Sequence, residues 1–183
     1  MRDLDGYTYH GPWPGGTPGA MRLLQAAGLI ALPVAGWGAW WLLAAMGRPV
    51  HAEAAIRLLS HPLASAGLAA LVAISHEALH VLAAGALGLR PSARWTRHGP
   101  AVATYGILGP WEIMATNLVP LAVGTLIALM AAARDPAAAW YAVALNAAAS
   151  VSDLATVLHL VGLPRGARVA SGIARDGVWV PTA

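Results

Sequence analysis

Four long apolar stretches restrict the environments in which this chain can fold. They span residues 23–46, 62–89, 111–133 and 137–163. Each has the roughly 20 residues that a helix needs to cross the hydrocarbon core of a bilayer. Hydrophobic residues make up 58% of the 183 residues and charged residues only 10%, whereas a soluble domain carries roughly 25% charged residues. The sequence therefore predicts an all-α integral membrane protein: four transmembrane helices in a single membrane domain, 1–183.

Shorter segments flank and connect these spans. Residues 1–20, rich in Gly and Pro, predict an irregular N-terminal head, and residues 164–183 form a C-terminal tail. Between the second and third spans, Ala101–Leu108 is short, partly β-branched and bounded by Gly-Pro pairs, which predicts a strand in a hairpin-like loop. The edge of such a strand could pair with an extended substrate peptide, and we expect its Tyr105 to contact substrate. The alternative is a surface hairpin with no role in binding.

Arginine supplies all eleven basic residues, and its distribution predicts an orientation. With four spans, eight arginines lie on the side of both termini and three on the other. The eight are Arg2, Arg22, Arg90, Arg94, Arg97, Arg165, Arg168 and Arg175, and the three are Arg48, Arg57 and Arg134. The positive-inside rule then places both termini in the cytoplasm, and we expect a prokaryotic cytoplasmic membrane. No basic run is dense enough for nucleic acid, so the expected surroundings are a lipid bilayer. The sequence predicts no oligomeric state.

Ionisable residues inside apolar spans are informative because each costs roughly 2.5–3.5 kcal/mol at mid-helix. Four such residues stand well inside the spans: His76, Glu77 and His80 in the second, and Asp153 in the fourth. Residues 76–80 read H-E-x-x-H, which places two imidazoles on one helix face with a carboxylate beside them. This pattern predicts that His76 and His80 bind Zn²⁺, which lowers the pKa of a water molecule, and that Glu77 removes its proton. The alternative is a polar patch that binds a neighbouring helix.

Two histidines leave a tetrahedral zinc site short of a third protein ligand, and Asp153 is the predicted one. His80 lies nine residues before the end of its span and Asp153 ten before the end of its own. At 1.5 Å per residue, both lie roughly 14–15 Å from the same membrane face. Asp153 could instead pair with Arg165 or cap a broken helix. His159 is the rival ligand, although its place near the span end favours an interfacial histidine.

Two further polar residues share the helix face of Asp153. Asn146 and Ser150 precede it with the spacing i, i+4, i+7, and we predict that both line the substrate site. Asn146 could donate a hydrogen bond to a substrate carbonyl, and Ser150 could instead orient Asp153. The alternative for both is hydrogen bonding between helices. In the third span, Pro120 frees a backbone carbonyl and could open a path to the site or serve packing.

These residues resemble a known family. The H-E-x-x-H motif inside a hydrophobic span, the hairpin-like loop and an Asp in a later span are similar to the site-2-protease clan of intramembrane zinc metalloproteases. The chain most resembles the small, four-span putative zincin peptidases, in which an Asn and a Ser-x-x-Asp element follow the zinc motif. The resemblance covers roughly residues 65–168 and implies that His76, His80 and Asp153 bind zinc and that Glu77 is the catalytic base. The chain departs from the larger site-2 proteases because it lacks the Pro and the final Gly of their Asn-x-x-Pro-x-x-x-Leu-Asp-Gly motif.

We therefore expect an intramembrane zinc metalloendopeptidase that hydrolyses a peptide bond of a membrane protein or peptide substrate. Two other functions fit the same residues. The first is a non-proteolytic zinc-binding scaffold or pseudoprotease. The second is a proton-coupled transporter in which His76, Glu77 and Asp153 form a proton relay.

Overall fold

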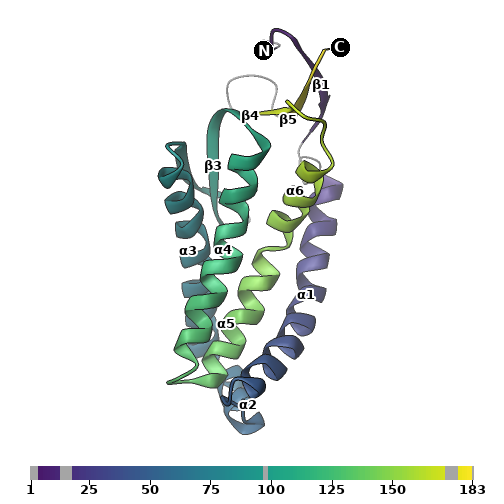
Figure 1. Cartoon of the computed structure of the whole chain (residues 1–183). Coiled ribbons are helices and arrows are strands. Elements are labelled where there is room, and N and C mark those ends of the chain that lie inside the picture. Colours follow the sequence, from purple (N-terminus) through teal and green to yellow (C-terminus); the bar gives the residue numbers. More distant parts are fainter. Residues whose placement is uncertain (1–3, 13–17, 97–98, 172–176, 183) are drawn as a thin grey trace. The chain divides into compact units, whose positions relative to one another are not determined.

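The structure, a computed structural model, describes residues 4–12, 18–96, 99–171 and 177–182. The described residues are mostly helical and include a small sheet (Figure 1). The helices are α1 (Pro18–Ala45), α2 (Ala52–Ser60), α3 (Pro62–Ala86), α4 (Pro110–Ala131), α5 (Pro136–Ala149) and α6 (Val151–Val161). The strands are β1 (Tyr7–Gly11), β2 (Arg90–Thr96), β3 (Gly99–Leu108), β4 (Arg168–Ser171) and β5 (Gly177–Pro181).

Three of the four predicted spans are single helices that are long and apolar enough to cross a membrane: α1, α3 and α4. The fourth predicted span is divided into α5 and α6, which together meet the same criterion but are bent by 45°. Ser150, at the break, explains the bend. Its hydroxyl donates to the carbonyl of Asn146 one turn earlier (2.8 Å), which already accepts the Ser150 N–H (3.0 Å). Such back-bonding by serine bends helices.

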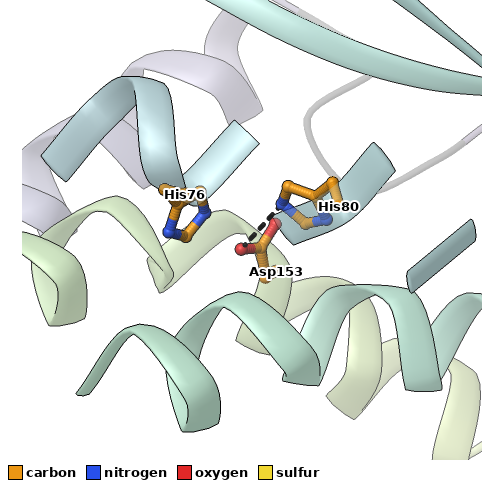
Figure 2. A group of neighbouring side chains, drawn as sticks. All are labelled: His76, His80 and Asp153. Atoms are coloured by element: carbon orange, nitrogen blue, oxygen red, sulfur yellow. Dashed lines mark ion pairs between the residues drawn. The ribbon is translucent and has the colours of Figure 1, made fainter. Parts of the chain in front are cut away.

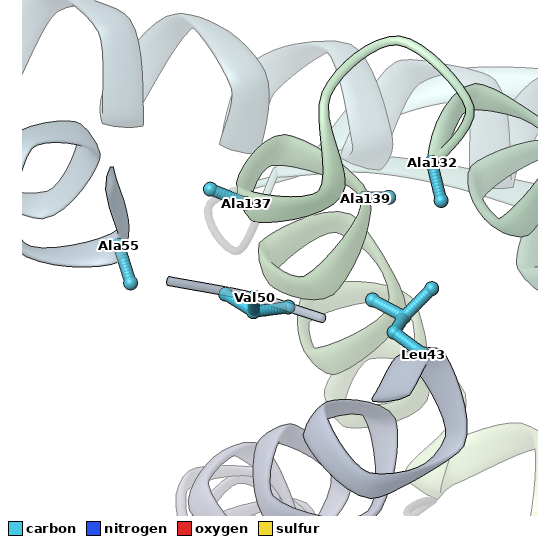
Figure 3. Packing of buried hydrophobic residues seen from close by; sticks show 6 residues of the cluster. All are labelled: Leu43, Val50, Ala55, Ala132, Ala137 and Ala139. Atoms are coloured by element: carbon cyan, nitrogen blue, oxygen red, sulfur yellow. The ribbon is translucent and has the colours of Figure 1, made fainter. Parts of the chain in front are cut away.

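Contacts divide the chain into two compact units, and the first to be described contains residues 25–79 and 120–151. Its main buried cluster combines two larger aliphatic side chains with four alanines (Figure 3). They are Leu43, Val50, Ala55, Ala132, Ala137 and Ala139. Alanine allows helix backbones to approach closely, which favours packing between apolar helices. Near this cluster, the Trp140 indole N–H donates to the Gly36 carbonyl of α1 at 2.7 Å. This core ties α1, α2, α4 and α5 together.

Helix α2 was not among the predicted elements. It has nine residues, and Ala55 is its buried member. A membrane span is indicated by an apolar run of about 20 residues, and a nine-residue helix falls below that length.

The second unit contains residues 1–24, 80–119 and 152–183, as far as these are described, and includes the whole sheet. The strand order is β1-β5-β4-β3-β2, and all neighbouring strands are antiparallel. In Figure 1 the first and last strands, β1 and β5, lie side by side. Trp179 of β5 is 1% exposed and meets Tyr9 of β1 edge-on, with ring centroids 5.3 Å apart.

The sheet corrects two predictions. The head is not irregular throughout, because residues 7–11 form β1, and the fold is not all-α, because five strands form a sheet. Strands β1, β4 and β5 have four or five residues each, too few for period-2 alternation to stand out in sequence. They are stabilised by partners far away in the chain.

The predicted strand at residues 101–108 is confirmed as part of β3, which forms a hairpin with β2. On its other side, β3 pairs with β4 only from Gly106 to Leu108. Within the described ranges, no strand pairs with this side of residues 101–105. The predicted free edge is therefore limited to that part of β3.

The turn between α4 and α5 gives the first testable prediction. The Asp135 carboxylate caps α5 by accepting the Ala138 N–H at 2.9 Å, and Pro136 occupies the first turn. Asp135→Ala should lower the free energy of unfolding by about 1 kcal/mol, because it leaves a helix N–H without its cap. Asp135→Asn should retain most of the stability, since asparagine caps equally well. Thermal unfolding in detergent micelles measures both, and equal melting temperatures for Asp135→Ala and the wild type would contradict the assignment.

Candidate metal centre

Helix α3 carries His76 and His80 one turn apart. His76 is buried, with 4% of its surface exposed, while Glu77 and His80 are half-buried. The helix ends after them at Ala86, and Gly88 follows with a φ of +70°, which suits the left-handed position after a helix C-terminus. The Leu89 N–H bonds to the Ala84 carbonyl (2.9 Å) and the Gly88 N–H to that of Gly85 (3.0 Å), which is the Schellman pattern. This termination explains why α3 stops at Ala86, three residues before the predicted end of the span.

His80 lies between two oxygen atoms. Its Nδ1 is 3.0 Å from the backbone carbonyl of Thr116 in α4, and its Nε2 is 3.5 Å from Oδ2 of Asp153 in α6. A carbonyl oxygen only accepts, so Nδ1 must carry the hydrogen. In the neutral imidazole, Nε2 then presents its lone pair to the carboxylate. Two lone pairs facing each other at this distance require a proton or a metal cation between them.

Pro120 explains why the Thr116 carbonyl is available to His80. In a regular helix this carbonyl would accept the N–H of residue 120, four positions later. Proline has no N–H, and Pro120 lies inside α4. The carbonyl that proline frees becomes the acceptor for His80 Nδ1 at 3.0 Å. The sequence pointed to a freed carbonyl at Pro120 but not to its partner, because pairing across 36 positions of the chain leaves no local pattern.

His76 is held through the same ring nitrogen. Its Nδ1 lies 3.0 Å from Oδ1 of Asn146 in α5, and Asn146 is itself 3% exposed. The Asn146 Nδ2 lies within 3.1–3.2 Å of three oxygens of α4: the carbonyls of Pro120 and Leu121 and the hydroxyl of Thr125. Asn146 thus contacts a predicted metal ligand. Its predicted contact with substrate stays a prediction.

The three predicted ligands lie close together. One ligand atom from each of His76, His80 and Asp153 lies within 4.8 Å of the others, and Figure 2 shows the three side chains facing one another. Asp153 is 8% exposed and lies in the first turn of α6. Two imidazoles and one carboxylate are a donor set that suits Zn²⁺. The depth estimate that paired Asp153 with His80 therefore agrees with their 3.5 Å approach.

The remaining candidates lie elsewhere. Ser150 is fully buried at the helix break and donates to the Asn146 carbonyl. The Tyr105 backbone lies in β3 opposite Arg90, and its side chain falls outside the described part of the structure. His159, the rival ligand, is not in the group of three, and its buried Nε2 has no hydrogen-bond partner among the described residues.

Comparison with known proteins identifies a family. A model of a family described as putative zincin peptidase matches residues 69–168, which include all three residues of the group. No curated protein and no solved structure matches the chain.

The Pro120–Thr116–His80 arrangement leads to the second prediction. Pro120→Ala returns an N–H to α4 that competes with His80 for the Thr116 carbonyl. We expect the affinity for Zn²⁺, measured by competition with a chelator, to fall about tenfold, the lower end of the range for loss of a partner of a metal-bound histidine. The matched control is Pro33→Ala, which repairs a helical hydrogen bond in α1, a helix that supplies none of the three ligands. Unchanged affinity in Pro120→Ala would show that the freed carbonyl does not matter for metal binding.

Proposed function

Since the chain belongs to the putative zincin peptidase family, we propose that it is an integral-membrane zinc endopeptidase that hydrolyses a peptide bond of a membrane-protein substrate. The single observation that carries this proposal is the convergence of His76, His80 and Asp153, with ligand atoms within 4.8 Å of one another. Family membership supports a metallopeptidase in general. The membrane setting, the substrate and the roles of individual residues are proposed here.

The hydrogen bonding and the charge of the three donors also suit a zinc ion. The hydrogen bond from His80 Nδ1 to the Thr116 carbonyl leaves Nε2 with a lone pair, which is the form that binds a metal ion. The nearby Asp153 oxygen adds a negative charge that favours a cation. When bound at such a site, Zn²⁺ lowers the pKa of water towards about 7 and polarises a carbonyl.

Glu77 is the proposed general base. It follows His76 on α3, so its side chain lies about 100° around the helix from that ligand, beside the metal site and outside the ligand set. In the proposed reaction its carboxylate takes a proton from the attacking water and later gives it to the leaving amine. The carbon–nitrogen bond breaks, the water oxygen remains on the new carboxyl group, and Glu77 is regenerated.

The membrane setting is supported by α1, α3, α4 and the bent pair α5–α6, which are apolar enough to span a bilayer. The strand order of the sheet supports four crossings of the membrane. β1 precedes α1, β2 and β3 lie between α3 and α4, and β4 and β5 follow α6, yet all five strands pair in one sheet. A sheet of this kind must lie on one side of the hydrocarbon region, because exposed strand edges are not tolerated inside it.

The chain must therefore cross an even number of times between β1 and β2, and again between β3 and β4. Helices α1 and α3 supply the first two crossings. Helix α4 and the pair α5–α6, counted as one span, supply the other two. This count favours four spans over a re-entrant loop. We propose that both termini lie on the cytoplasmic side, as the arginine distribution indicates.

The substrate is proposed to be a transmembrane segment of another protein, because a site carried on apolar spans lies at membrane depth. The chain shares this feature with site-2 proteases, which it resembles in its H-E-x-x-H span and later Asp. A helical substrate must unwind before its carbonyls are accessible. The side of residues 101–105 in β3 that lacks a strand partner among the described residues offers backbone groups to an extended peptide.

The third prediction concerns the base. Glu77→Gln should abolish peptide cleavage, because the amide cannot accept the proton from water, while zinc remains bound at the wild-type level. Cleavage of membrane-protein substrates in proteoliposomes and elemental analysis of the same preparation measure the two properties. Wild-type cleavage by Glu77→Gln would exclude Glu77 as the base.

The fourth prediction concerns the ligands. The double variant His76→Ala/His80→Ala should lose zinc and cleavage together, because two of the three donors are removed. The matched control is His51→Ala/His61→Ala, which deletes two exposed histidines at the ends of α2 and should retain zinc. Equal zinc content in the two double variants would refute the site. Zinc retained by the wild type without cleavage of any membrane-protein substrate would favour a non-proteolytic zinc protein.

A further inference from the structure

We propose that Asn146 is a positioning residue for the metal ligand His76, and that α4 fixes the orientation of its amide. The inference rests on the proposed function, because it requires that His76 bind a metal ion. It assigns Asn146 a role in metal binding in place of a contact with substrate.

Helix α4 determines the orientation of the Asn146 amide. Three oxygens of α4 lie within 3.1–3.2 Å of Nδ2: the carbonyls of Pro120 and Leu121 and the hydroxyl of Thr125. Carbonyl oxygens accept and cannot donate, so the amide end that faces them must be the NH₂ group. The opposite end, Oδ1, therefore faces His76.

The orientation of the amide in turn determines the tautomer of His76. Its Nδ1 lies 3.0 Å from Oδ1 of Asn146, an oxygen that only accepts. Nδ1 must then carry the hydrogen, and Nε2 keeps the lone pair. The Asn146 amide, oriented by α4, thus selects the tautomer of His76 in α3 that binds a metal ion through Nε2. Hydrogen-bond partners of this kind orient metal-bound histidines and raise their basicity.

The Asn146 amide occupies space beside Gly124 that a larger residue would fill. A Cβ atom built on Gly124 of α4 would lie 2.9 Å from Nδ2 and 3.0 Å from Oδ1 of Asn146. These distances are shorter than non-bonded contacts tolerate, so a larger residue at position 124 would displace the amide. Glycine here allows α4 to approach the amide closely enough for Pro120 and Leu121 to accept its hydrogens.

The same hydrogen bonds disfavour a direct contact between Asn146 and substrate. Both hydrogens of the Asn146 amide are directed at α4, and its oxygen accepts from His76. At 3% exposure, the side chain would have to break bonds inside the protein before it could donate to a substrate carbonyl. Breaking them would take the buried amide away from the partners that the protein supplies, which is costly.

The experiment compares Asn146→Leu with Asn146→Asp. Leucine has a similar size but no polar atoms, while aspartate keeps an oxygen that can accept from His76 Nδ1 and loses the NH₂ group. We expect the Zn²⁺ affinity of the full-length protein, measured by chelator competition in detergent, to fall about 10- to 100-fold in Asn146→Leu. Asn146→Asp should bind Zn²⁺ more tightly than Asn146→Leu. The visible spectrum with Co²⁺ in place of Zn²⁺ should change in Asn146→Leu, since it reports ligand geometry.

A second variant keeps the test decisive if Asn146→Leu does not fold. Gly124→Ala removes no polar group, but its added methyl group displaces the Asn146 amide, so it should also weaken Zn²⁺ binding. Its matched control is Gly67→Ala in α3, where an added Cβ meets nothing within 4 Å and the affinity should not change. Melting temperatures of the metal-free proteins identify any loss of affinity that only reflects instability.

Several results would overturn the inference. One is a Zn²⁺ affinity equal to that of the wild type in both Asn146→Leu and Gly124→Ala. Another is a loss of Zn²⁺ affinity in Asn146→Asp as large as that in Asn146→Leu. A raised KM with unchanged metal affinity would return Asn146 to substrate binding. If the wild type itself bound no Zn²⁺, the proposed function would fail first. Zinc binding by the wild type therefore distinguishes failure of this inference from failure of the proposed function.

Discussion

Buried imidazoles in an apolar helix need hydrogen-bond partners that the helix itself does not provide, and the candidate site is organised around this requirement. The backbone of α3 already uses its own donors and acceptors. His80 finds its acceptor in the Thr116 carbonyl of α4, and His76 finds its acceptor in the Asn146 amide. In both cases the bond uses Nδ1, so both histidines present the same ring nitrogen, Nε2, for a ligand.

Helix α4 supplies none of the three predicted ligands, yet the hydrogen bonds of both histidines lead to it. Pro120 contributes in two ways. Its missing N–H frees the carbonyl that binds His80, and its own carbonyl accepts from the Asn146 amide. A single proline thus connects the two hydrogen-bond networks. The sequence marked Pro120 as a source of a free carbonyl, and the structure shows which side chains benefit.

The parts of the fold that sequence predicted are those with strong local signals. Long apolar runs predicted α1, α3 and α4, and the Gly-Pro boundaries predicted β3. The short strands β1, β4 and β5 lacked such a signal, because the sheet depends on the long-range pairings of β1 with β5 and of β3 with β4. The bend at Ser150 was missed because a serine inside an apolar run does not reveal whether its hydroxyl will bond to the preceding turn.

The site followed the same division. The grouping of residues 76–80 with Asp153 could be predicted from the sequence, since it depends on spacing along helices. The hydrogen bonds of Asn146 could not, because its helix-face pattern with Asp153 indicated a shared cavity and could not show that α4 binds the amide. Thr116, Gly124 and Thr125 carried no signal of their own. Thr116 contributes a backbone oxygen, Gly124 the absence of a side chain, and Thr125 a hydroxyl group.

The sheet also has a consequence for how the protein is made. Its strands come from before the first apolar helix, from the middle of the chain and from beyond the last helix, and β5 bridges β1 and β4. Strand β1 precedes all six described helices in the chain, yet its partner in the sheet emerges from the ribosome only with residues 177–181. Completion of the sheet therefore follows the synthesis of all six described helices, and with the proposed spans it depends on each span having been inserted in the correct direction.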